Sequence, residues 1–326
     1  MRVSVLIPTR DRLPYLRLSL ESARLQTDAD LEIVVSDDGS TDGSREYVAD
    51  VAASDPRVRL LTDNPTPGIF ENVEHLIDRA TGDAFTILGD DDLIDPDFCA
   101  LLIRPMEADP SLALTFTDHR RIDADGRLLT KSTEAASIRY GRAALPDGVV
   151  AEPEIVALRG GIWLGFTMFR RAALGDARFD RSLGTAADWD FAIRAAQRGG
   201  LYYVAGRHGE YRDHLATASR QGLQDEAELA IRVLSKHAFQ DPLAEATRRA
   251  MLRSAAGRHA YQSATKDAES AHRSLRLHRS LGGSLMAPHA LLAELLLRLP
   301  PRAAIPIQRA VSRASRAIRS GAGTVR

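Results

Sequence analysis

Apolar and polar positions alternate in two regular patterns along the first hundred residues of the chain. Short apolar runs rich in β-branched residues recur at 3–9, 31–37, 57–63 and 84–90. Between these runs, apolar positions recur at helical spacing over residues 13–26, 42–53 and 69–80. Short strands that alternate with helices of this length form parallel sheets with helices on both faces. The pattern therefore predicts an α/β fold with a mostly parallel sheet.

Polar clusters follow three of these apolar runs. They are Thr9-Arg10-Asp11, Asp37-Asp38-Gly39 and Asp90-Asp91-Asp92. In open α/β sheets, ligands bind beyond the carboxyl ends of the strands. Three strands that end in polar residues therefore predict a binding site along this edge of the sheet.

The third cluster, called the triplet below, concentrates the carboxylates of residues 90–92 at the end of one apolar run. Adjacent like charges repel, and helix capping does not account for them, because one carboxylate is enough for a cap. Asp95, which precedes Pro96, is the expected N-cap of the next helix. Carboxylates on a strand-end loop can bind a divalent cation, and Mg²⁺ takes one or two of them together with phosphate oxygens and water. The triplet therefore predicts a cation site for a phosphate-containing substrate.

The composition is that of a folded globular protein, but charge is divided unevenly along the chain. Of 326 residues, 44% are hydrophobic and 27% are charged, with a net charge of −1. Residues 241–326 contain 15 Lys and Arg against 5 Asp and Glu, whereas residues 1–240 contain 28 against 39. An acidic body with a basic C-terminal segment predicts contact between that segment and an anionic surface. Nucleic acid is not the expected partner, because the basic segment lacks interleaved aromatic residues.

Cysteine content and hydropathy indicate the cellular compartment in which we expect the protein. Cys99 is the only cysteine, so no intramolecular disulfide can form and a reducing environment is expected. The apolar run at 3–7 is too short for a signal peptide. The apolar stretch at 288–299 is shorter than the ~20 residues that a membrane span requires, and Glu294 and Arg298 interrupt it. We therefore expect a cytoplasmic protein, either free or peripheral on the inner face of the membrane.

The last hundred residues predict helices, and the final helix has a basic face. Residues 224–280 show the pattern of two or three amphipathic helices. A later segment places Ile307, Val311, Ala314 and Ile318 on one helical face, and Arg309, Arg313, Arg316 and Arg319 on the other. Such a helix suits a membrane interface, and an anionic membrane surface is therefore an expected partner. An Arg-coated helix packed on the body and a disordered tail are the alternative interpretations.

Four segments, in this order and at this spacing, resemble the motifs of one enzyme family. They are VSVLIPTRDR (3–12), LEIVVSDDGSTDGS (31–44), NPTPGIFENVEHLIDRATGDAFTILGDDDLIDPDF (64–98) and DWDFAIRAAQRG (188–199). Together they resemble the family 2 glycosyltransferases, which have the Rossmann-like GT-A fold. The resemblance covers residues 1–222 and implies a nucleotide-sugar-binding half (1–110), an acceptor half (111–222) and a separate helical extension (223–326). It also implies inverting transfer of a sugar from a nucleotide-diphosphate sugar, usually a UDP-sugar, to a hydroxyl of a glycan or lipid-linked acceptor.

The same resemblance implies roles for residues at the donor site. Pro8, Thr9 and Arg10 match the first loop, which borders the nucleotide base. Asp38 matches the carboxylate that accepts the N3–H of uracil, a role that suits a group able only to accept. Asp90 matches the residue near the ribose hydroxyls. Arg212 lies in a segment that resembles the loop closing over the diphosphate, and it is expected to bind phosphate.

The metal ligands are implied in the same way. Asp91 matches the principal ligand of a divalent cation, Mn²⁺ or Mg²⁺, and Asp92 and His214 are further candidate ligands. Gly89 stands where many relatives have the first Asp of the DxD motif. That motif can therefore be read as residues 89–91 or as residues 90–92.

Asp188 matches the general base of the family, which would take the proton of the acceptor hydroxyl. Relatives usually carry Glu-Asp at this point, and this chain has Ala187-Asp188. Asp188 is expected at the start of a helix, so the alternative is that it only caps that helix. Asp190 is expected to have a structural or solvent-facing role.

Two other classes of protein fit part of the pattern. A nucleotidyltransferase also alternates strands with helices and uses acidic metal ligands, but it should open with a Gly-rich basic loop, and this chain has PTRDR (8–12) there. A non-catalytic protein that binds sugar nucleotides or glycans would keep the fold and lose the base or the metal ligands. The presence of both the triplet and Asp188 favours the enzyme.

Overall fold

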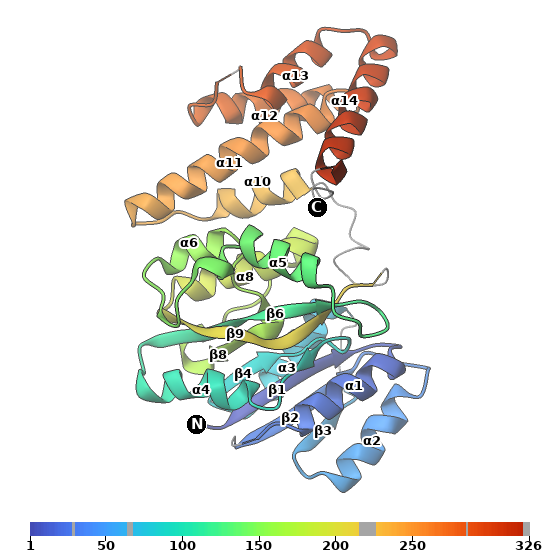
Figure 1. Ribbon diagram of the computed structural model, residues 1–326, viewed down its shortest axis with the longest axis vertical. Coiled ribbons are helices and arrows are strands. Elements are labelled where there is room, and N and C mark those ends of the chain that lie inside the picture. The colour runs from blue at the N-terminus through green and yellow to red at the C-terminus, as the bar shows by residue number, and fades with distance from the viewer. Residues whose placement is uncertain (28–29, 64–67, 215–225, 285, 322–326) are drawn as a thin grey trace. The chain divides into compact units, whose positions relative to one another are not determined.

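The computed structural model describes residues 1–326 except 28–29, 64–67, 215–225, 285 and 322–326, and it leaves out the side chains of 301 and 314–321. The predicted facial positions of Ala314, Arg316, Ile318 and Arg319 therefore lie outside the described side chains. The chain divides into two compact units, Met1–Gly222 and Leu223–Arg326. Figure 1 shows both units, coloured from the N-terminus to the C-terminus.

The first four strands of the first unit form a parallel sheet in the order β3-β2-β1-β4. They are β1 (Val3–Thr9), β2 (Leu31–Asp37), β3 (Val58–Leu61) and β4 (Ala84–Ile87). The helices between them are α1 (Leu13–Arg24), α2 (Ser44–Ser54) and α3 (Ile69–Arg79). Strands β1, β2 and β4 are buried along almost their whole length, which accounts for their continuous apolar runs. The predicted α/β fold is confirmed in this half.

The second half of the sheet adds strands that the sequence pattern did not reveal, and some of them pair in antiparallel orientation. They are β5 (Leu93–Ile94), β6 (Leu112–Ile122), β7 (Gly148–Val149), β8 (Thr167–Arg170) and β9 (Gly200–Arg212). Strand β8 runs antiparallel to both β4 and β6, while β6 and β9 are parallel. Strands β5 and β7 pair antiparallel with β9. The sheet is therefore mixed, with its parallel β1–β4 portion carrying the predicted binding edge.

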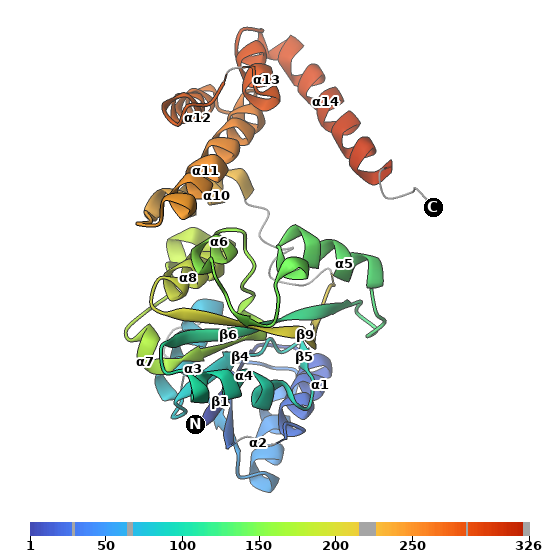
Figure 2. The same ribbon diagram turned by 60° about the vertical axis from the view of Figure 1, so that its left-hand side comes forward.

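Helices and short helical turns surround this second half. They are α4 (Phe98–Ala108), α5 (Thr130–Arg139), η1 (Arg142–Ala144), α6 (Pro153–Leu158), η2 (Leu164–Phe166), α7 (Arg171–Leu174), η3 (Arg181–Ala186) and α8 (Ala187–Ala196). Helices α5, α6 and α8 lie on one side of strands β6 and β9, and α4 lies on the other (Figure 2). The sheet is therefore covered on both faces here as well.

The start of α4 differs from the sequence prediction. Asp95 was the expected N-cap, but α4 begins at Phe98, and Asp97 stands at the N-cap position without a side-chain capping bond. The carboxylate of Asp95 instead pairs with the guanidinium of Arg120. This pair is possible because β6, which carries Arg120, packs beside the loop that contains Asp95.

The second unit consists of helices α10 (Glu226–Lys236), α11 (Pro242–Ser263), α12 (Ala268–Ser280), α13 (Pro288–Leu297) and α14 (Pro301–Gly321). Its hydrophobic core is rich in small residues, including Ala260, Ala264, Ala271, Ala290 and Ala293. Small side chains allow the helices to approach closely. Asp241 and Asp267 cap α11 and α12 by accepting hydrogen bonds from the N–H groups of the residues three positions ahead. Within the described part of the chain, we find no helix that combines the length and the apolar character needed to cross a membrane.

Candidate functional site

The loop after β1 is fastened to its neighbours by side-chain hydrogen bonds. The buried Thr9 hydroxyl donates to Asp90 Oδ2 over 2.9 Å, which joins this loop to the triplet. Asp11 has a φ of +50°, an uncommon conformation for a residue with a side chain. Its N–H donates to Ser40 Oγ, and its carboxylate accepts from the Thr41 N–H over 2.7 Å. These bonds hold the strained turn and place the first two polar clusters side by side.

The two carboxylates of the second cluster have different surroundings. Asp37 is buried and accepts hydrogen bonds from Arg45 Nε and from the Ser40 N–H, so it holds the turn after β2. Asp38 accepts a hydrogen bond from the Gly68 N–H at the start of α3 over 3.0 Å. The guanidinium of the exposed Arg10 lies 3.7 Å from Asp38. The structure thus brings Arg10 and Asp38 together at the edge, beside the partly buried Pro8.

The triplet carboxylates carry negative charge into a poorly solvated loop. Asp90 and Asp92 are buried, while Asp91 is partly exposed. Burial, with a further contribution from the negative charge of Asp91, raises the pKa of Asp90 to about 7. The same two causes, burial first, raise the pKa of Asp92 well above its usual value. A cation bound among these groups would relieve both effects.

A carboxylate oxygen of Asp91, the middle residue of the triplet, lies close to an imidazole nitrogen of His214. His214 Nε2 lies 3.0 Å from Asp91 Oδ2, and the imidazole ring stacks on Tyr15 with a centroid separation of 5.0 Å. A carboxylate oxygen and an imidazole nitrogen are suitable ligands for Mn²⁺, and the carboxylate also suits Mg²⁺. The residues present therefore fit a divalent cation. Asp92 lies behind them, where its Oδ1 accepts a hydrogen bond from the Arg212 N–H.

Gly89 lies close to two of these carboxylates. A Cβ atom added at Gly89 would lie 3.0 Å from Asp91 Oδ1 and 3.0 Å from Asp92 Oδ2. Contacts this short would push at least one carboxylate aside. The departure from the common DxD spelling at this position therefore has a steric reason, because the absent side chain leaves room for the two carboxylates.

The structure gives Arg212 contacts that the sequence did not predict. Its side chain is buried, and the guanidinium donates hydrogen bonds to the backbone carbonyl oxygens of Asp91, Asp123 and Ala124. It also lies over the ring of Tyr15 at 5.1 Å. These contacts give Arg212 a supporting role beneath the triplet loop, and its expected contact with phosphate stays a prediction.

Arg12 is a residue that the sequence interpretation missed. Its guanidinium contacts Asp91 Oδ2 and lies 3.8 Å from Asp90 Oδ1. The signal available in the sequence was its position two residues after Arg10, in the same strand-end loop. The helical spacing of residues alone could not show that the Arg12 side chain turns back from the start of α1 toward the triplet.

Asp188 lies in the first turn of α8, as expected, with its side chain open to solvent. Surrounding protein nevertheless displaces much of its hydration, and this desolvation raises the pKa of Asp188 to about 6. The Trp189 N–H donates to Asp188 Oδ1, and the Trp189 indole N–H donates to the Ala157 carbonyl, which anchors the start of α8 to α6. Asp190 is fully buried and pairs with Arg194, which is a structural role.

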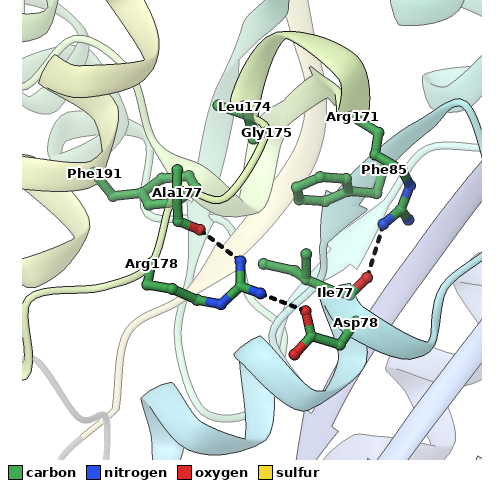
Figure 3. Close-up of a pocket in the computed structure, with 9 residues that line it drawn as sticks. All are labelled: Ile77, Asp78, Phe85, Arg171, Leu174, Gly175, Ala177, Arg178 and Phe191. Carbon is green, nitrogen blue, oxygen red and sulfur yellow. Dashed lines mark hydrogen bonds and ion pairs between the residues drawn. The ribbon is translucent and has the colours of Figure 1, made fainter.

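A separate cavity of about 210 Å³ lies near the amino-terminal end of β4, whereas the triplet follows the carboxyl end of that strand. Its lining includes Phe85, Phe191 and Arg178, and the Arg178 guanidinium is paired with Asp78 (Figure 3). None of the predicted site residues lines this cavity. The candidate site is therefore the strand edge and not this enclosed space.

Comparisons with known proteins agree with the fold and the motifs. The model of glycosyl transferase family 2 matches residues 4–175, just over half of the chain. The chondroitin synthase of Pasteurella multocida is 28% identical over 199 residues, which are 60% of this chain and 19% of that protein. The chain thus aligns with about a fifth of the length of this relative.

Solved structures extend the likeness in fold over nearly the whole chain. Staphylococcus aureus TarS 1–349, in complex with UDP-GlcNAc, superposes with a TM-score of 0.60 at 16% identity and covers 97% of this chain and 92% of that one. The mannosyltransferase PcManGT of Pyrobaculum calidifontis, in complex with GDP-Man and Mn²⁺, gives 0.57 at 19% identity and covers 94% and 84%. The family match favours a glycosyltransferase over the nucleotidyltransferase and non-catalytic alternatives. The chain belongs to glycosyl transferase family 2.

Proposed function

We propose that this enzyme transfers a sugar from a UDP-sugar to a hydroxyl group of a glycan or lipid-linked acceptor, with inversion of the anomeric centre. The observation that carries the proposal is the approach of Asp91 Oδ2 and His214 Nε2 to 3.0 Å beside two further carboxylates. Family membership and the nucleotide-sugar complexes of two structural neighbours support the donor class. The glycan acceptor is supported by the similarity to a chondroitin synthase.

The strand edge offers a complementary surface for the nucleoside. Asp38, which is an acceptor only, would take the N3–H of uracil, with Pro8 and Arg10 beside the base. Asp90 would face the ribose hydroxyls, and the hydrogen bond from Thr9 Oγ1 fixes its orientation. Uracil presents one N–H donor to the Asp38 carboxylate, whereas guanine presents both N1–H and an exocyclic amino group. Direct comparison of UDP with GDP therefore tests this assignment.

The ligands for the divalent cation would be Asp91 and His214, with the buried Asp92 as a further candidate. When bound, the cation supplies positive charge that stabilises the diphosphate leaving group. Arg212 supports Asp91 from behind through the hydrogen bond from its Nε to the Asp91 carbonyl oxygen, 2.8 Å long. Asp91 is thus held through its backbone carbonyl by Arg212 and through its carboxylate by Arg12 and His214.

Asp188 would remove the proton from the acceptor hydroxyl as that oxygen attacks the anomeric carbon. A base is most effective when its pKa lies near the working pH, and the raised pKa of about 6 suits this role. A single displacement assisted by one carboxylate base gives inversion. Solvent exposure of the side chain leaves it accessible to an acceptor.

The test is nucleotide release from a panel of UDP- and GDP-sugars, measured with Mn²⁺, with Mg²⁺ and with EDTA. We expect release from a UDP-sugar that depends on the cation and that is lost in Asp91→Asn, together with weaker UDP binding. Exchange of Asp176, an exposed residue after α7, for Asn is the matched control and should change neither. Full wild-type activity in excess EDTA would overturn the metal role, and release from GDP-sugars alone would overturn the uracil assignment.

The basic C-terminal helix supports a second part of the proposal, contact with an anionic membrane that carries the acceptor. Residues 270–326 contain ten basic residues and one acidic residue. Arg302, Arg309 and Arg313 of α14 are exposed. Each basic residue near an anionic leaflet contributes about 1 kcal/mol, so several together outweigh the weak insertion of one short apolar face.

Co-sedimentation with vesicles tests this contact. The full chain should bind anionic vesicles at low salt and lose binding as salt screens the charges over a length of about 8 Å at physiological strength. A variant with Gln at Arg309, Arg313, Arg316 and Arg319 should bind much less. The control variant has Gln at four exposed arginines of the first unit, Arg104, Arg127, Arg139 and Arg159. Equal binding by the two variants would contradict membrane contact through this helix.

A further inference from the structure

Arg12 brings a permanent positive charge to the side chains of the triplet. Its guanidinium contacts Asp91 Oδ2 and lies 3.8 Å from Asp90 Oδ1. A guanidinium stays protonated at every physiological pH, so this charge cannot be removed by titration. The contact is shielded, because the side chains of Arg12 and Asp91 are 25% and 14% exposed. Arg12 therefore compensates part of the negative charge that burial concentrates in this loop.

The same oxygen of Asp91 also faces His214. Asp91 Oδ2 is the atom that lies 3.0 Å from His214 Nε2, and it is also the atom that Arg12 contacts. A divalent cation held by Asp91 and His214 would need this oxygen. Because a cation and a guanidinium repel each other at short range, both cannot bind Asp91 Oδ2 at full strength.

We propose that Arg12 is a positioning residue that couples the binding of the divalent cation to the binding of the nucleotide diphosphate. Arg12 competes with the cation for Asp91, which weakens cation binding to the protein alone. A diphosphate offers the displaced guanidinium new oxygen partners in a bidentate geometry. The cation and the nucleotide diphosphate therefore bind more tightly together than separately. The inference rests on the proposed function, because it assumes that Asp91 is a metal ligand.

The local structure allows the Arg12 side chain to exchange partners while its backbone stays in place. Arg12 occupies the N-cap position of α1, and its backbone carbonyl accepts hydrogen bonds from the N–H groups of Tyr15 and Leu16. The following residue is held independently, because the Leu13 N–H donates to Asp42 Oδ2 over 2.8 Å. Pro14 also restricts the first turn of the helix. A change of partner at the guanidinium thus requires rotation about side-chain bonds only.

Thermodynamic linkage between Mn²⁺ binding and UDP binding makes this proposal measurable. If UDP strengthens Mn²⁺ binding by some factor, Mn²⁺ must strengthen UDP binding by the same factor. A hydrogen bond to a charged group corresponds to a change in affinity of about tenfold or more. Loss of the competing guanidinium should therefore strengthen Mn²⁺ binding to the protein alone by about tenfold, while the effect of UDP on Mn²⁺ binding shrinks by a similar factor.

The experiment is titration of the full chain with Mn²⁺, with free Mn²⁺ followed by electron paramagnetic resonance, in the absence and presence of UDP. Arg12→Ala and the better volume match Arg12→Gln should both bind Mn²⁺ alone more tightly than the wild type and respond less to UDP. Arg12→Lys keeps the charge and should keep the weak binding of Mn²⁺ alone, but UDP should strengthen its Mn²⁺ binding less than in the wild type, because lysine cannot bind phosphate in a bidentate geometry. Arg17→Ala is the control on the same helix, because Arg17 is exposed and lies over Tyr47. Thermal unfolding and circular dichroism establish that each variant is folded.

The outcomes separate this inference from the function on which it rests. If the wild type binds Mn²⁺ and UDP strengthens that binding, but Arg12→Ala and Arg12→Gln bind Mn²⁺ alone no more tightly, the competition is overturned and the metal site stands. If the wild type binds UDP and no Mn²⁺ under either condition, the metal role fails and the coupling fails with it. Tighter Mn²⁺ binding in the Arg17 control would also overturn the assignment, because the effect would then follow from net charge.

Discussion

Replacement of Asp188 by Asn separates chemistry from binding in this enzyme. The change keeps the shape of the side chain and removes its ability to take a proton. A positioned general base contributes about 10²–10⁴-fold in rate, which corresponds to about 3–5 kcal/mol of barrier. Because the base would act on the acceptor, kcat should fall by that factor while the affinity for the donor changes by less than about twofold. Steady-state nucleotide release, beside calorimetric titration with UDP, measures both quantities.

The pH dependence of the wild type provides an independent measure of the same residue. A base must be deprotonated to act, so kcat/KM should fall as the pH drops through the pKa of about 6. Between pH 7 and pH 5 the ionised fraction of such a group decreases by about tenfold. A carboxylate at the usual Asp value of 3.8 would remain almost fully ionised over this range. The acidic limb near pH 6 should therefore disappear in Asp188→Asn, together with most of the activity.

Two results would refute this reasoning. Retention of wild-type kcat by Asp188→Asn would show that Asp188 is not the general base and has only a structural role at the start of α8. A profile that is flat between pH 5 and pH 8 would show that no group with a pKa near 6 controls the reaction. Asp176→Asn is again the control, and it should reproduce both the rate and the acidic limb of the wild type.

Three further predictions concern binding and stability. Asp38→Ala should weaken UDP binding by about tenfold or more, whereas Asp37→Ala should lower Tm because Asp37 holds the turn. Titration calorimetry with UDP measures the first effect, and scanning calorimetry measures the second. An equal loss of UDP affinity in the two variants would contradict this difference in roles. Gly89→Ala should weaken Mn²⁺ binding, because the added Cβ would lie 3.0 Å from two triplet carboxylates; unchanged affinity would refute the steric argument. Asp118→Asn should cost about 3–5 kcal/mol, because it leaves the buried Arg142 guanidinium without its carboxylate partner, and scanning calorimetry should show a decrease in Tm on the order of 10 °C.

The parallel part of the sheet was predictable from local pattern, and strands β5 to β9 were not. The runs that became β1, β2 and β4 are continuous and apolar because parallel strands are buried on both faces. Strand β5 is only two residues long and exists because it pairs with β9, more than a hundred residues later. A segment this short has no periodicity of its own, so only its partner identifies it as a strand.

The sequence by itself determined that three polar clusters follow three strands, because strand pattern and side-chain chemistry are local properties. Only the tertiary structure decided which member of each cluster takes which role. Asp37 and Asp38 are adjacent, yet one is buried against Arg45 and the other faces Gly68. Arg12 and Arg212 both belong to motif segments, yet the packing of β9 behind the triplet turns the Arg212 guanidinium to backbone carbonyls and leaves Arg12 at the carboxylates. These choices depend on contacts between residues far apart in the chain, which no local pattern records.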